Sequence, residues 1–127
     1  MKILEDLFSE RKNSDRVRIA AGEMLMQNDP EKNLNNFIME LDEAKQKNQN
    51  NLYNGLLKII AGTKCGGMED ITRRLLKNPG MVEKVSALTM AANNNLISLA
   101  DDIKALTEDR NESLARRARQ TLKKLGI

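Results

Sequence analysis

The clearest structural signal in this sequence is the stretch NESLARRARQTLKKLG, which spans residues 111–126. Its apolar residues recur every three or four positions and are Leu114, Ala118, Thr121, Leu122 and Leu125. Successive residues of an α-helix are turned by about 100°, so these side chains fall on one face. Gly126 follows as a C-terminal cap. The stretch therefore predicts an amphipathic helix over residues 112–125.

Apolar residues recur at the same spacing along the rest of the chain. The predicted core faces are Val17, Ala20, Ala21, Met24 and Leu25; Leu34, Phe37, Ile38 and Leu41; Leu52, Leu56, Ile59 and Ile60; Val82, Val85, Leu88, Thr89 and Ala92; and Leu96, Leu99, Ile103 and Leu106. No window alternates with the two-residue period of a strand. The predicted fold class is all-α: a compact α-α superhelix, or helical-repeat bundle, of about eight short helices.

Turn-forming residues mark the helix boundaries. Asp29-Pro30-Glu31 supplies an N-cap acceptor, a proline at the first helical position and an acid near the positive helix end. Asn78-Pro79-Gly80 marks a stop followed by a turn. With the remaining glycine and asparagine clusters, these marks predict helices at residues 2–11, 14–27, 30–47, 51–62, 68–77, 81–92, 95–107 and 112–125.

Length and composition bound the organisation and the compartment. A chain of 127 residues fits one domain, predicted to cover 1–127. Only 2% of the residues are aromatic, so Leu, Ile, Met, Val and Ala must build the core. Cys65 is the only cysteine, which rules out an internal disulfide. No apolar leader and no run of about 18 apolar residues is present. We therefore expect a soluble cytoplasmic protein that does not enter a membrane.

A weak internal repeat appears when alternate predicted helices are aligned. Triplets beginning at Val17, Leu52, Val82 and Leu114 are offset by 35, 30 and 32 residues. Near-constant spacing in this range is typical of stacked helical hairpins. The alternative is that any small helix bundle contains such triplets.

Two families resemble parts of the chain. Residues 106–126 resemble a HEAT-like unit: a leucine ends one helix, a short acidic turn follows, and the next helix reads apolar-Arg-x-x-Ala-x-x-x-Leu-x-x-Leu-Gly. Asp15–Ala21 is a shorter match to the same pattern. The segment from Ile71 to Leu125 is similar to the helical N-terminal domain of elongation factor TFIIS, through Ile103–Leu106 and Leu114–Ala118. Either resemblance implies a module that docks onto other proteins.

The sequence carries no recognisable catalytic or metal-binding constellation. It contains no histidine, which removes the commonest general base and the commonest metal ligand. Cys65, between Lys64 and Gly66, has no base to activate it and is interpreted as a spare cysteine. Acid pairs such as Asp101-Asp102 lack the spacing of a calcium loop. We predict no enzymatic activity, no cofactor and no metal site.

Positive charge is concentrated at the end of the chain. Residues 110–127 contain six Lys and Arg against one acid, Glu112. The candidate partner-binding residues are Arg116, Arg117, Arg119, Lys123 and Lys124. Arg116, Arg119, Gln120 and Lys123 lie opposite the apolar face of the predicted helix 112–125, and Arg117 and Lys124 lie on its flank, so the helix carries a positive stripe. The stripe is open to three interpretations: a dock for an acidic protein surface, a contact to nucleic-acid phosphates, or an ordinary solvated face.

The function predicted from the sequence is a non-enzymatic protein–protein interaction module. Such a module would act as an adaptor, inhibitor or regulator through a helical surface, with another protein, acidic on its contacting side, as the partner. The alternative is a nucleic-acid-associated or transcription-linked module that uses the basic C-terminal helix. Association with a second copy of the chain is also left open.

Overall fold

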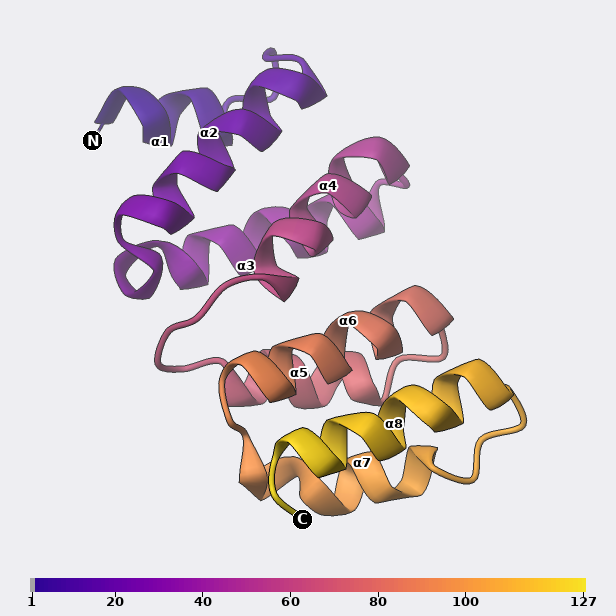
Figure 1. Cartoon of the computed structure of the whole chain (residues 1–127). Helices are drawn as coiled ribbons and strands as arrows, with labels where there is room; N and C mark the ends of the chain where they lie inside the picture. The colour runs from indigo at the N-terminus through magenta and orange to yellow at the C-terminus, as the bar shows by residue number, and fades with distance from the viewer. Residues whose placement is uncertain (1) are drawn as a thin grey trace. The chain divides into compact units, whose positions relative to one another are not determined.

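The computed structural model describes residues 2–127, which form eight α-helices and no strand (Figure 1). The helices are α1 (Lys2–Ser9), α2 (Asp15–Asn28), α3 (Pro30–Gln46), α4 (Asn50–Ala61), α5 (Glu69–Leu76), α6 (Met81–Asn93), α7 (Ala100–Leu106) and α8 (Glu112–Lys124). A short 3-10 turn, Ile97–Leu99, leads into α7. The all-α prediction is confirmed. Apart from the start of α7, each boundary lies within two residues of its predicted position.

The chain divides into two compact units. The N-terminal unit ends at Thr63, and the C-terminal unit runs from Lys64 to Ile127. In the N-terminal unit α1 packs on α2, α3 packs on α4, and the two hairpins meet through α2 and α4. The C-terminal unit repeats this plan, with α5 on α6, α7 on α8, and α6 against α8. The expectation of one domain over residues 1–127 stays a prediction.

Local capping explains where the helices begin and end. The Asp29 carboxylate accepts a hydrogen bond from the Lys32 backbone N–H at 3.2 Å, with Pro30 at the first helical position. At the end of α8, Gly126 adopts a φ of 81°, and the Ile127 N–H donates to the Leu122 carbonyl at 3.0 Å. This pattern is the glycine-dependent helix ending that the sequence predicted.

Two stacked rings centre the core of the N-terminal unit. Phe8 and Phe37 lie 5.4 Å apart between ring centroids, with their planes 18° from parallel. Gly22 of α2 faces them: a Cβ at this position would lie 2.8 Å from Phe8 and 3.2 Å from Phe37. Only glycine lets α2 approach the two rings this closely.

A buried ion pair also holds the N-terminal unit together. The Arg18 Nη2 atom lies 2.5 Å from Glu40 Oε1, and Arg18 Nε donates to the Phe8 carbonyl at 2.8 Å. The pair therefore links α1, α2 and α3. Arg11 approaches Glu40 at 3.6 Å and also pairs with Glu43. Its hydrogen bond lowers the pKa of Glu43 and raises that of Arg11.

Two of the predicted core faces are only partly correct: Ala21 and Leu25 on α2 and Leu88 on α6 are buried as predicted, but other members are not. On α2, Val17, Ala20 and Met24 are exposed. On α6, Val82 is 60% exposed and Thr89 is also exposed. In each helix the buried face is turned to include a charged residue. The buried residues are Arg18, Ala21, Gly22, Leu25 and Met26 on α2, and Glu83, Ala87, Leu88, Met90 and Ala91 on α6.

The burial of Glu83 has a local cause. Its carboxylate folds back over the start of α6, where a Cβ added to Gly80 would lie 2.1 Å from Glu83 Oε1. A carboxylate at this position faces the positive end of the helix dipole. Met81 and Glu112, the first residues of α6 and α8, are 31 residues apart. Glu83 therefore corresponds to Leu114, and aligning Val82 with Leu114 displaced the predicted repeat by one residue.

Candidate functional site

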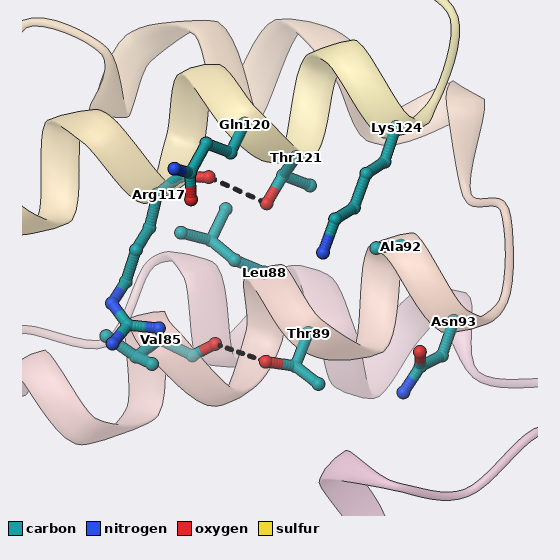
Figure 2. Close-up of a pocket in the computed structure, with 9 residues that line it drawn as sticks. All are labelled: Val85, Leu88, Thr89, Ala92, Asn93, Arg117, Gln120, Thr121 and Lys124. Atoms are coloured by element: carbon teal, nitrogen blue, oxygen red, sulfur yellow. Dashed lines mark hydrogen bonds between the residues drawn. The ribbon is translucent and has the colours of Figure 1, made fainter.

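A groove runs between α6 and α8 in the C-terminal unit. The two helices lie side by side and run in the same direction (Figure 1). Their shared surface contains a hollow of about 100 Å³. The wall from α6 consists of Val85, Leu88, Thr89, Ala92 and Asn93. The wall from α8 consists of Arg117, Gln120, Thr121 and Lys124 (Figure 2).

The groove explains the misplaced face of α6. Four of the five residues that the sequence assigned to the core on this helix line the groove, and of these only Leu88 is also buried. Their 3- and 4-residue spacing is real, and it places them on one side of α6. On that side Leu88 is buried, and the small side chains of Thr89 and Ala92 border the hollow.

The floor of the groove is closed by buried side chains. Leu88 is 2% exposed and Thr121 is 6% exposed. The Thr121 hydroxyl donates to the Arg117 carbonyl at 2.8 Å, and the Thr89 hydroxyl donates to the Val85 carbonyl at 3.2 Å (Figure 2). Both hydroxyls therefore donate within their own helices, and most of the surface that lines the groove is polar.

The rim of the groove is positively charged. Arg117 and Lys124 are exposed and extend from α8 toward α6 at different points along the groove (Figure 2). They are seven residues apart, which corresponds to about 10.5 Å along the helix axis. Neither makes an ion pair with any residue from 2 to 127. The rim therefore presents two cations without ion-pair partners beside the hollow.

The structure divides the five predicted partner-binding residues into three groups. Arg117 and Lys124 line the groove. Arg116 and Lys123 are exposed on α8 outside the groove lining. Arg119 is held within the unit, where it donates to the Thr107 carbonyl at 3.1 Å and pairs with Glu112 at 2.8 Å. Arg119 therefore fixes the turn between α7 and α8.

The contribution of α6 to this site was not predicted from the sequence. The basic stripe was assigned to a single helix, and Val85, Thr89 and Ala92 were assigned to the core. Gln120 was placed on the polar side of α8 without a role. Only the pairing of α6 with α8 brings these side chains together.

The electrostatics of the whole C-terminal unit support the charge of the rim. Residues 64–127 contain 12 Lys and Arg against 8 Asp and Glu. Like-signed charge over a concave surface raises the local concentration of oppositely charged ligands. The positive charge of the unit therefore has the sign that attracts an acidic segment to the groove.

The other candidate groups show no comparable arrangement. Cys65 is half-buried in the connection between α4 and α5, and its backbone N–H donates to Asn94 Oδ1 at 3.0 Å. Among residues 2–127, no three His, Cys, Asp or Glu side chains are grouped so as to hold a metal ion. None of the helices described above is both long and apolar enough to span a bilayer.

Comparison with known proteins identified no relative of this chain. No protein-family model, curated protein or solved structure gave a significant match. The HEAT-like and TFIIS-like resemblances therefore stay expectations that come from the sequence, and the functional argument rests on the groove.

Proposed function

We propose that this protein is a non-enzymatic protein–protein interaction module that binds an acidic partner protein through α8 and the groove beside it. The observation that carries the proposal is the pair Arg117 and Lys124, which are exposed, have no ion-pair partners and border the hollow between α6 and α8. Arginine is enriched in protein interfaces. Bound to such a partner, the module acts as an adaptor, inhibitor or regulator.

The aromatic residues favour a protein partner over a nucleic acid. Phe8, Phe37 and Tyr53 are the only aromatic residues of the chain, and all three are buried in the N-terminal unit. The C-terminal unit consequently has no ring on which a base could stack. The four free cations of α8 still favour polyanions, so binding to phosphates through charge alone is the second candidate.

The stacking of hairpins supports a helical-repeat interpretation. Each unit joins two hairpins through their second helices, the arrangement that repeat proteins use to bury a shared face. The helix starts support it too, since Asp15 and Asn50 are 35 residues apart and Met81 and Glu112 are 31 apart. A reducing cytoplasm is the proposed location, because Cys65 is the only cysteine.

The proposal is tested by reversing charge at the groove. The double variant R117E/K124E is expected to lose capture of protein partners from a cell lysate. A matched control is K77E/K104E, which reverses two exposed lysines of the same unit, both near helix C-termini but outside the groove. Both variants should keep the melting temperature within a few degrees, since exposed substitutions usually change stability by about 0.5 kcal/mol or less.

The outcomes separate the two candidates. Partner capture that survives R117E/K124E in a folded protein would remove the protein-docking proposal. A steep fall in affinity for generic DNA or RNA between low and high salt, with no protein captured, would support the nucleic-acid candidate instead.

A further inference from the structure

We propose that the groove between α6 and α8 receives one face of an acidic amphipathic α-helix whose two carboxylates are seven residues apart. This inference rests on the proposed function and specifies the partner's chemistry. It draws on two features of the site: the spacing of the two rim cations and the small hollow that both of them border.

The spacing of the rim cations matches a helical ligand. Arg117 and Lys124 lie on one helix at positions i and i+7, about 10.5 Å apart along its axis. A helix laid along the groove has the same rise, so its own residues i and i+7 share a face at the same spacing. In an extended segment, residues three apart span about 10 Å, but they point to opposite faces. The two cations are therefore matched by a helix and not by a strand.

The floor determines what lies between the two carboxylates. Leu88 is nearly fully buried at the base of the groove, and Thr89 and Ala92 border the space above it. A ligand side chain at i+3 or i+4 points to the same side as the acids and enters this space. The hollow of about 100 Å³ has room for single side chains of the ligand and not for a whole helix. Only one face of the ligand is buried, and its other side stays in solvent.

Synthetic helices of equal charge test the spacing. The first peptide is an alanine-based helix with Glu at i and i+7 and Leu at i+3 and i+4. The second has the same composition with the second Glu moved to i+5, which places this Glu about 140° around the helix from the first Glu. Fluorescence anisotropy of labelled peptides titrated with the full chain reports affinity. An exposed ion pair is worth a factor of about 1.5 to 5, so the first peptide should bind several-fold tighter.

Two protein variants test the groove itself. Thr89→Phe fills the hollow without changing charge, and it should weaken the i, i+7 peptide about tenfold or more. In R117E/K124E the same peptide should lose binding, and a peptide with Lys at i and i+7 should regain it. Rescue by the opposite charge would show direct pairing, which a loss of folding cannot imitate.

The results distinguish failure of this inference from failure of the proposed function. If both peptides bind equally, weaken together in R117E/K124E and ignore Thr89→Phe, the basic face of α8 attracts acids but the groove does not select a helix. If neither peptide binds while lysate capture still requires Arg117 and Lys124, the partner is not an acidic helix. If the peptides do not bind and no protein partner is captured from the lysate, both this inference and the proposed function are wrong.

Discussion

Among single residues, the buried pair Arg18–Glu40 is the most consequential for stability. Removing one partner of a buried pair leaves an uncompensated charge and typically costs about 3–5 kcal/mol. We expect Glu40→Ala to lower the free energy of unfolding by this amount in urea denaturation. The control is Glu10→Ala, which removes an exposed contact to Lys12 at 3.4 Å and should cost less than about 1 kcal/mol.

A double substitution separates charge burial from packing at the same site. Replacing both partners with apolar residues, as in Arg18→Met with Glu40→Leu, should recover most of the stability lost in Glu40→Ala. If Glu40→Ala were no more costly than Glu10→Ala, the ion pair would not organise the N-terminal unit.

Glu69 gives the C-terminal unit a defined pH dependence. The Ser98 hydroxyl donates to its carboxylate and Arg73 lies 3.4 Å away, which together lower the pKa of Glu69 below its ordinary value of 4.5. A lowered pKa in the folded state stabilises the fold above the ordinary value. This contribution is lost as pH falls below 4.5 through the lowered pKa.

Ser98→Ala tests this assignment. Loss of the hydroxyl should raise the pKa of Glu69 toward its ordinary value, as followed by carboxyl chemical shifts in an NMR titration. The pKa of Glu43, which is held down by Arg11, should not move. An unchanged pKa for Glu69 would show that Ser98 does not act on it.

At the scale of helices, the close approach of α2 to the aromatic pair makes Gly22 hard to replace. Glycine to alanine inside a helix normally gains about 1 kcal/mol. Here the added Cβ meets Phe8 at 2.8 Å, and overpacking of a core typically costs about 1–3 kcal/mol. We expect Gly22→Ala to be net destabilising in thermal and urea unfolding.

Gly62 provides the matched control for this substitution. A Cβ there would have no neighbour closer than 3.8 Å, and the residue ends α4 with a φ of −92°, which alanine adopts readily. Gly62→Ala should change stability by about 0.5 kcal/mol or less. Equal effects at the two glycines would contradict a steric role for Gly22.

Helix faces also show how far periodicity predicts this fold. Helix positions were predictable because Asp29, Pro30 and Gly126 mark ends through backbone chemistry that depends on local sequence alone. The buried faces of α2 and α6 were not fully predictable, because a pattern of apolar residues assigns charged residues such as Arg18 and Glu83 to the solvent-facing side. Arg18 is buried because it pairs with Glu40 on another helix, whereas Glu83 is buried because its carboxylate folds back over the start of its own helix.

The candidate site was predictable only in part for a related reason. Net charge located the basic residues of α8 correctly, since charge is a property of the local sequence. Which of them are available was decided by neighbours, with Arg119 bound to Glu112 and Thr107. The groove itself required knowing that α6 lies beside α8, which no single helix encodes.

For the whole molecule, we derive a prediction from the division of the chain into two units between Thr63 and Lys64. Each unit has its own helices and buried residues, so a fragment of residues 64–127 should be helical by circular dichroism and melt cooperatively. At this length the fragment should be less stable than the full chain, because small domains bury a smaller fraction of their surface. A random-coil spectrum would favour the single domain expected from the sequence.

The placement of the three aromatic rings has a practical consequence for every such measurement. With no Trp in the chain, Tyr53 is its main intrinsic fluorophore, and it is packed in the N-terminal unit. Native tyrosine emission and near-ultraviolet absorption therefore monitor that half of the chain and are blind to the other. A single tryptophan engineered into α6 or α8 would have no background from other tryptophans. Its emission would report ligand binding in the groove, while the emission of Tyr53 would report on the N-terminal unit.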